Sequence, residues 1–128
     1  MGKKRILLID DEIGFTQLLK LNLEKTGTYE VRVENKGARG AAVAAEFHPD
    51  LVLLDIIMPD IDGGQVASQI KEQRGMRETP ILFVTAIVSK KETMTCKNGL
   101  IGGHPFIAKP VDTDEVVESI EKTLSHRG

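Results

Sequence analysis

Short apolar runs alternate along the chain with longer segments in which apolar residues recur every three or four positions. The short runs are typical of strands, and the longer segments are typical of amphipathic helices. Strands are predicted at residues 5–9, 29–33, 51–54, 81–84 and 106–108. Helices are predicted at residues 12–26, 36–47, 64–74 and 112–124.

This alternation favours a parallel sheet that is covered by helices on both faces. We predict an α/β, flavodoxin-like doubly wound fold with five parallel strands in the order 2-1-3-4-5. In such a sheet the ligand site lies at the carboxyl ends of the strands, near the point where the strand order reverses. Polar residues at those ends are therefore the first candidates for chemistry.

The fourth helix of this fold, expected at residues 89–98, has weak support in its sequence. The segment SKKETMTCKN contains β-branched threonines and offers only Met94 and Cys96 as core contacts. We predict that this helix is short, irregular or mobile.

The composition is that of one globular domain, with 128 residues of which 41% are hydrophobic and 28% are charged. The net charge of −2 argues against direct binding of nucleic acid, because phosphates select basic faces. The single cysteine, Cys96, excludes an internal disulfide and a cysteine zinc cage. The N-terminal apolar run is too short for a signal peptide or a membrane span, so a cytoplasmic protein without a membrane partner is expected.

Polar side chains of related chemistry follow four of the predicted strands. Acids come after the first and third strands, a threonine after the fourth and a lysine after the fifth, namely Asp10, Asp11, Glu12, Asp55, Thr85 and Lys109. Because these four strands are neighbours in the predicted order, we expect their carboxyl ends to bring the side chains into one pocket.

The charges in this pocket indicate its chemistry. Close carboxylates repel one another, and a divalent cation removes the repulsion. Oxygen ligands together with several waters suit Mg²⁺ better than zinc. A hydroxyl and an ammonium group that face one carboxylate suit an anion with three oxygens, such as a phosphoryl group. The sequence therefore indicates magnesium-dependent phosphoryl transfer to or from a carboxylate, with Asp55 as the candidate nucleophile.

Each of these residues, taken alone, also has an ordinary structural interpretation. Acids that directly follow a strand often favour the positive end of a helix. Asp60 and Asp62 are typical turn residues, and a threonine at a strand end or a Lys-Pro pair in a loop is common. The joint arrangement at the expected strand ends is what favours a functional site.

The segments around these residues resemble the receiver domain of two-component response regulators, over about residues 4–125. The matching segments are LLIDDE (7–12), DLVLLDIIMPDIDGG (50–64), PILFVTA (80–86) and FIAKP (106–110). The resemblance implies one receiver domain over residues 1–128, similar to single-domain chemotaxis regulators, which either stands alone or is cut from a longer protein.

By this resemblance, Asp55 accepts a phosphoryl group from a phosphohistidine of a sensor histidine kinase or a phosphotransfer protein. Asp11, Asp55 and the carbonyl of Ile57 are implied to coordinate Mg²⁺, while Asp10 acts through metal-bound water. The amide of Ile57 is implied to contact the phosphoryl group. The domain is then expected to switch between two conformations, and to be no enzyme beyond its own phosphoryl transfer and autodephosphorylation.

The resemblance also assigns residues that surround the phosphoryl group. Lys109 is implied to pair with its oxygens, Thr85 to move toward them, and the amide of Ala86 to complete the cradle. Phe106 stands where the family has an aromatic switch that turns inward on activation. The bond between Lys109 and Pro110 is expected to be cis, because proline lowers the cost of that isomer.

The segment before Lys109 departs from the family pattern, because it is longer than expected. The extra residues are assigned to the stretch GGHP at 102–105, in which His104 is predicted to be a turn residue. The family passes its signal to an output partner through the face made by helix 4, strand 5 and helix 5. This face is therefore where the chain differs most from the family, and its partner is unknown.

Two other functions are compatible with such a fold. A receiver-like docking module would not accept phosphate and would bind partners through the atypical region around helix 4. An aspartate-nucleophile phosphohydrolase requires a second aspartate two positions after the first, but here Glu12 stands two positions after Asp10. The retained acids, with Thr85 and Lys109, favour the phosphorylated receiver.

Overall fold

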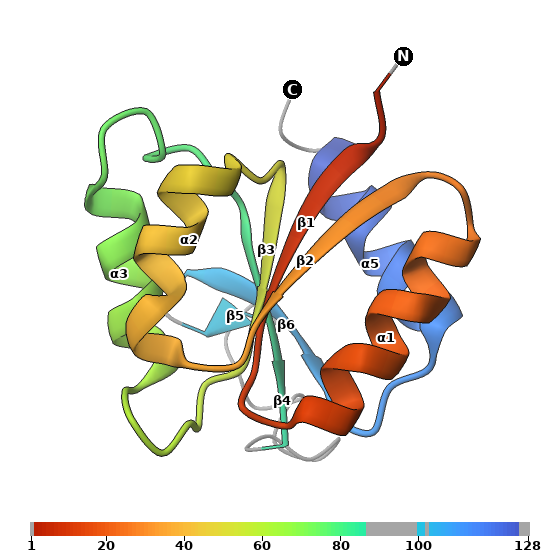
Figure 1. Ribbon diagram of the computed structural model, residues 1–128, viewed down its shortest axis with the longest axis horizontal. Helices are drawn as coiled ribbons and strands as arrows, with labels where there is room; N and C mark the ends of the chain where they lie inside the picture. Colours follow the sequence, from red (N-terminus) through yellow and green to blue (C-terminus); the bar gives the residue numbers. More distant parts are fainter. Residues whose placement is uncertain (1, 87–99, 102, 126–128) are drawn as a thin grey trace.

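The computed structural model describes residues 2–86, 100–101 and 103–125, which form a sheet with helices on both faces (Figure 1). The strands are β1 (Lys4–Ile9), β2 (Tyr29–Glu34), β3 (Leu51–Leu54), β4 (Ile81–Thr85), β5 (Leu100–Ile101) and β6 (His104–Ala108). The helices are α1 (Ile13–Lys25), α2 (Gly40–Phe47), α3 (Gly63–Glu72) and α5 (Thr113–Ser125), with a 3-10 turn η1 (Gly37–Arg39) before α2. The helix predicted at residues 89–98 lies outside the described residues.

Among the described residues, the sheet has six strands in the order β2-β1-β3-β4-β6-β5. The strands from β2 to β6 in this order pair in parallel. This arrangement confirms the predicted doubly wound order, with β6 as the fifth parallel strand. The short strand β5 is an addition that the sequence did not predict, and it pairs with β6 in antiparallel fashion.

The prediction that His104 is a turn residue was wrong. His104 begins β6 and pairs with Ile101 of β5, and the turn before it contains Gly103, whose φ of 85° suits glycine. The imidazole of His104 lies edge-on to the ring of Phe83 in β4, with the ring centroids 5.6 Å apart. Because a glycine occupies the left-handed turn position, the histidine after it is free to extend the strand.

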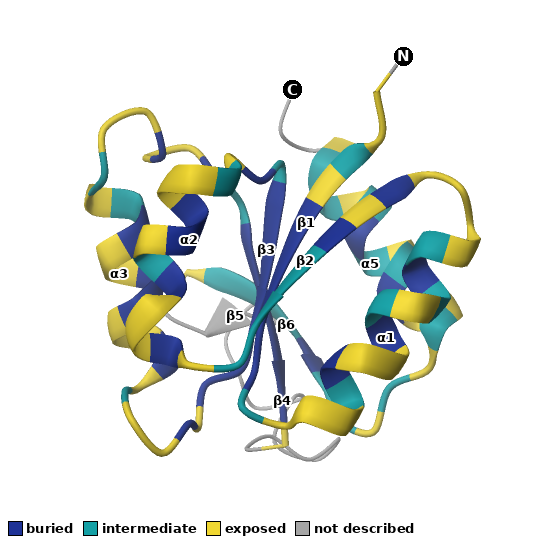
Figure 2. Ribbon diagram, in the orientation of Figure 1, coloured by how far each residue is buried: buried dark blue, intermediate teal, exposed yellow. Residues whose placement is uncertain are grey.

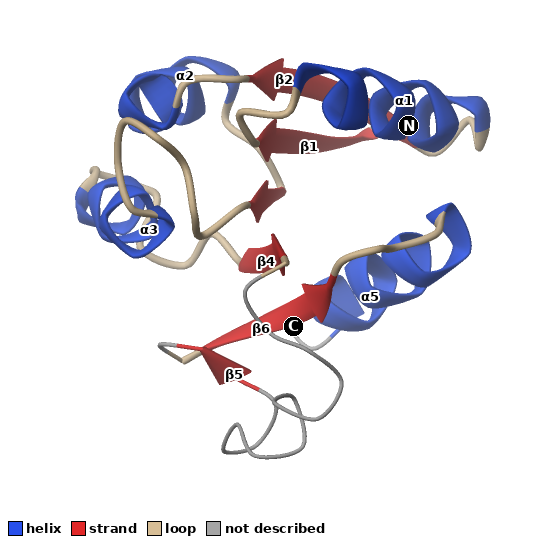
Figure 3. Ribbon diagram, turned by 90° about the horizontal axis from the view of Figure 1, so that it is seen from below, coloured by secondary structure: helices blue, strands red, loops and turns tan. Residues whose placement is uncertain are grey.

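Each face of the sheet has its own apolar core. Helices α2 and α3 cover one face, and α1 and α5 cover the other (Figure 3). Side chains of the central strands alternate between the two cores: Leu7 and Ile9 of β1 pack toward α2 and α3, and Ile6 and Leu8 pack toward α1 and α5. Figure 2 shows the central strands as almost continuously buried, which explains their unbroken apolar runs. None of the described helices combines the length and the hydropathy needed to cross a bilayer.

The chain's single tyrosine joins three elements at the end of the sheet where β1 and β2 begin. Tyr29 of β2 donates a hydrogen bond to Glu121 of α5, and Lys4 of β1 donates another to the same carboxylate at 2.8 Å. Burial and the bond to Glu121 raise the pKa of the Tyr29 phenol above its ordinary value of 10.0. The phenol therefore keeps its proton while the chain is folded.

This linkage predicts how stability changes in alkali. Above pH 10.0 the unfolded chain loses the Tyr29 proton and the native chain retains it, so the free energy of unfolding should fall as the pH rises. Ultraviolet absorbance of the phenolate reports on Tyr29 alone, because the chain has no other tyrosine. We expect the native titration to lie above the titration in concentrated urea. Coincident titration curves would contradict the prediction.

Candidate functional site

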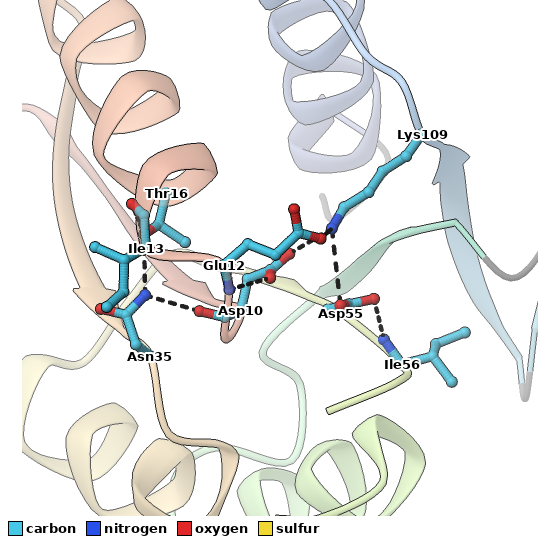
Figure 4. Close-up of polar contacts among 8 residues, drawn as sticks. All are labelled: Asp10, Glu12, Ile13, Thr16, Asn35, Asp55, Ile56 and Lys109. Atoms are coloured by element: carbon cyan, nitrogen blue, oxygen red, sulfur yellow. Dashed lines mark hydrogen bonds and ion pairs between the residues drawn. The ribbon is translucent and has the colours of Figure 1, made fainter. Parts of the chain in front are cut away.

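The carboxyl ends of β1, β3 and β6 bring acids and a lysine together (Figure 4). Nζ of Lys109 lies 2.8 Å from Oδ2 of Asp10, 2.9 Å from Oε1 of Glu12 and 3.7 Å from Oδ2 of Asp55. Asp10 and Asp55 are 1% and 6% exposed, so both carboxylates are screened from bulk water. The lysine thus provides the positive charge that these buried acids require.

Three acids in this pocket are spaced so that they could hold one cation. Carboxylate oxygens of Asp10, Asp11 and Asp55 all lie within 4.8 Å of one another. A set made only of oxygen donors, with two buried carboxylates and one half-buried carboxylate, is the set that Mg²⁺ prefers. The structure therefore brings together the three acidic residues that the sequence suggested as metal ligands.

Burial raises the pKa of the Asp10 and Asp55 carboxyl groups above their ordinary value of 3.8. The negative charge of Asp10 raises the pKa of Asp55 further, while Lys109 opposes both shifts. Burial alone would lower the pKa of Lys109, but its hydrogen bonds to Asp10 and Glu12 raise it, so the ammonium stays charged. The ionised acids thus remain costly at neutral pH, and a bound cation offsets that cost.

A side chain directly after β2 fixes the turn that contains Asp10 and Glu12. Nδ2 of Asn35 donates to the carbonyl oxygen of Asp10 at 2.8 Å and to Oγ1 of Thr16 at 2.9 Å. Oδ1 of Asp10 accepts a hydrogen bond from the amide of Glu12 at 2.9 Å. Asn35 was not predicted from the sequence, because a neutral amide beyond the predicted edge strand has no charge pattern that connects it with the acids.

The turn after β3 fixes the orientation of the Asp55 carboxylate. Its Oδ1 accepts a hydrogen bond from the amide of Ile56 at 2.8 Å, while its Oδ2 faces Lys109. Asp62 then caps α3, since its Oδ1 accepts the amide of Gly64 at 2.6 Å. One carboxylate oxygen is thus fixed by the backbone and the other faces the ammonium.

The remaining residues assigned to the phosphoryl cradle lie at the same ends of the strands. Thr85 is fully buried at the end of β4, and its hydrogen bond to Asp55 lowers the pKa of that carboxyl group. Ala86, the next residue, is exposed. Ile57 is 62% exposed, two positions after Asp55. Both residues thus lie in the loops that follow β3 and β4, and both are exposed to solvent.

Phe106 lies in β6, and Lys109 directly follows this strand. Phe106 pairs in register with Phe83 of β4 and packs, half-buried, against the core under α2 and α3. The Lys109–Pro110 bond is cis, and the amide of Lys109 donates to the carbonyl of Thr85 at 2.9 Å. The backbone of β6 therefore links the lysine of the pocket with the half-buried aromatic ring.

Residues 6–121 match the family model described as the response regulator receiver domain. The chain belongs to this family. A receiver domain protein described as CheY-like, from Methanospirillum hungatei JF-1, has a similar structure, with a TM-score of 0.81 and 28% identity. The similarity covers 98% of this receiver domain and 97% of that chain.

Two curated relatives differ in how much of their length this receiver domain matches. It is 35% identical to the alkaline phosphatase synthesis transcriptional regulatory protein PhoP of Bacillus subtilis over 94% of its own length, but this is only 48% of PhoP. It is 29% identical to the polar-differentiation response regulator DivK of Brucella ovis, over 94% of its length and 96% of DivK. The chain spans about half the length of the transcriptional regulators it matches.

Proposed function

We propose that this receiver domain accepts a phosphoryl group on Asp55 from a phosphohistidine of a histidine kinase or a phosphotransfer protein, and changes conformation in response. The observation that carries the proposal is the Lys109 ammonium, 3.7 Å from Oδ2 of a buried carboxylate. In the transfer, this oxygen bonds to phosphorus as the bond between phosphorus and the ring nitrogen breaks. The nitrogen keeps the electron pair of the broken bond.

The chain's own residues are proposed to stabilise the charge on the transferred group. Lys109 neutralises the negative charge that gathers on the phosphoryl oxygens. Thr85, which contacts the Asp55 carboxylate before transfer, donates to a phosphoryl oxygen afterwards. The amides of Ile57 and Ala86 complete the cradle. These contacts exist only after phosphorylation, so they favour one conformation over the other.

The proposed cofactor is Mg²⁺, held by Asp11, Asp55 and the carbonyl of Ile57, with Asp10 acting through bound water. The donor set supports this assignment, because the three carboxylates lie within 4.8 Å of one another and two of them are buried. A bound Mg²⁺ supplies positive charge to the acids and to the phosphoryl oxygens.

The conformational change is proposed to reach the output partner through β6 and the segment that contains Lys109. Phe106 lies three positions before this lysine and is proposed to turn further inward when Lys109 and Thr85 contact the phosphoryl group. The face that includes β6 and α5 then binds the output partner. Residues 1–128 are proposed to act as one such signalling domain, in which self-catalysed phosphoryl transfer and autodephosphorylation are the only chemistry.

The phosphoryl donor is proposed to approach beside α1, whose first residues follow the acids. This helix exposes Ile13, Leu18 and Leu21, each more than half accessible. Exposed apolar side chains on the helix that starts at the pocket suit the docking of a partner protein. The encounter is proposed to take place in the cytoplasm, because the single cysteine suits a reducing compartment.

The test is the intact mass of the protein after incubation with Mg²⁺ and acetyl phosphate. We expect one phosphoryl adduct, which is absent when EDTA replaces the metal and absent in the Asp55→Asn variant. Asparagine has nearly the shape of aspartate but lacks the nucleophilic oxygen, so the variant keeps the fold and loses the chemistry. A folded wild-type protein that takes no adduct would instead indicate a docking module.

A further inference from the structure

Lys109 is held at rest mainly by the segment that follows β1, and less by Asp55. Its ammonium is within hydrogen-bond distance of Asp10 and Glu12, at 2.8 Å and 2.9 Å, whereas Oδ2 of Asp55 lies at 3.7 Å. Nζ also lies 4.5 Å from the centroid of the Phe15 ring in α1. The resting ammonium is thus engaged by two carboxylates and one aromatic face, all from within six residues of one another.

We propose that Glu12 and Phe15 act as positioning residues that hold the Lys109 ammonium at rest and compete for it with a phosphoryl group on Asp55. The inference rests on the proposed function and extends it, because it makes two residues outside the metal and phosphoryl contacts determine how readily the domain is phosphorylated. Glu12 and Phe15 do not touch the transferred group. They act through the position of Lys109.

The geometry of the ammonium explains the competition. An ammonium group has three N–H donors, and at rest two of them are directed to Asp10 and Glu12. A phosphoryl group on Asp55 adds three oxygens on the side where Nζ has an ion pair but no hydrogen bond. The third N–H can donate to one of these oxygens, but a second bond to the phosphoryl group requires Lys109 to give up a resting contact.

Glu12 is the contact that gives way most easily. Its side chain is 59% exposed, whereas the side chain of Asp10 is 1% exposed, so water replaces the lost bond at Glu12 but not at Asp10. Phe15 adds a cation–π attraction, which water also replaces at moderate cost. Glu12 and Phe15 therefore hold the Lys109 ammonium weakly enough that it can move to a phosphoryl group on Asp55.

Three variants separate the restraint from simple charge repulsion. Glu12→Gln removes both the ion pair and a negative charge near the incoming phosphate. Glu12→Asp keeps the charge but shortens the reach to Nζ by one methylene group, and Phe15→Leu removes the aromatic face without changing any charge. The matched control is Glu46→Gln, which breaks an exposed ion pair with Arg32 (3.1 Å) away from the pocket.

The measurement is the initial rate of adduct formation with Mg²⁺ and acetyl phosphate, whose bond from phosphorus to the acetate oxygen breaks with the electron pair leaving on acetate. We expect all three pocket variants to react about two- to fivefold faster than wild type, the factor that an exposed ion pair or cation–π contact represents. Glu46→Gln should react at the wild-type rate. If only Glu12→Gln is faster, charge repulsion explains the effect and the proposal fails.

A second readout does not depend on phosphorylation. Solvent exchange of the Lys109 ammonium protons, followed by nuclear magnetic resonance in the unphosphorylated protein, should be faster in Glu12→Gln and Phe15→Leu than in wild type. Unchanged exchange in both variants would overturn the proposal. Wild-type protein that takes no phosphoryl group would refute the proposed function, while the exchange result would still decide whether these residues hold the lysine.

Discussion

Phosphorylation of the Lys109→Met variant by acetyl phosphate is expected to be about 100-fold slower than that of the wild-type protein, the usual cost of removing one preorganised group that stabilises transition-state charge. Methionine keeps much of the length and apolar character of the lysine stem but lacks the ammonium. The variant leaves Asp55 in place, so the nucleophile remains and only the charge opposite it is lost. The rate of adduct formation, measured by intact mass, tests this expectation.

The same variant should also change how stability depends on pH. Lys109 lowers the pKa of Asp10 and Asp55, so its removal raises both further above 3.8. A native state with raised carboxyl pKa values binds more protons than the unfolded state, so its stability falls as the pH rises through that range. Lys109→Met should therefore lose most stability at neutral pH and regain part of it in acid.

Lys71→Met is the matched control for the phosphorylation rate, because Lys71 of α3 donates an exposed bond to the carbonyl of Arg77 at 3.1 Å and has no ion pair with the acids of the pocket among the described residues. It should be phosphorylated at the wild-type rate. A Lys109→Met rate within threefold of wild type would show that the ammonium is not the group that stabilises the transfer.

Replacement of Gly63 by alanine is expected to cost about 3 kcal/mol or more of the free energy of unfolding, the upper range for overpacking a tight contact. A Cβ atom at this position would lie 2.2 Å from the carbonyl oxygen of Asp55 and 2.6 Å from Cα of Ile56. Both atoms belong to the backbone, so no side chain can rotate away to make room. The start of α3 must separate from the strand end that carries the nucleophile.

Urea denaturation of Gly63→Ala and Gly64→Ala measures this contact with a control one residue away. At Gly64 the nearest atom to an added Cβ is Oδ1 of Asp62 at 3.0 Å, the end of a flexible side chain. Alanine is favoured over glycine in a helix by up to about 1 kcal/mol, and part of this gain at the first turn of α3 offsets the tight contact, so Gly64→Ala should be nearly neutral. Equal stability of the two variants would contradict the proposed backbone clash.

The strand order and the location of the site were predictable, because both depend on features that are local in sequence. Asp55 directly follows an apolar run, and Lys109 directly follows another, so the order of the strands is sufficient to bring them to one edge. Strand β5 was not predictable, since Leu100 and Ile101 are too few to show any periodicity. The pairing of Ile101 with His104 depends on the turn at Gly103, whose conformation could not be predicted from the sequence.

The contacts that hold the site in place were beyond sequence reasoning for a different reason. Asn35 reaches the carbonyl of Asp10 across 25 positions, and Glu12 reaches Lys109 across 97. Glu12 fits the pattern of a helix-start acid, and nothing local distinguishes that role from an ion pair with a distant lysine. Only the packed sheet shows which long side chains meet.

The parallel sheet also determines the order in which this pocket can assemble as the chain is synthesised. Pairing of β1 with β3 needs only the first 55 residues, and it already brings Asp10 and Asp55 to the same edge. Lys109, separated from Asp10 by 99 positions, joins them only when β6 pairs with β4. Because synthesis proceeds from the amino-terminal end, β1 and β3 are complete before Lys109 exists, so any pairing of these strands that precedes β6 brings the like charges together without their counter-charge. Docking of the last parallel strand is thus the step that neutralises the nascent pocket.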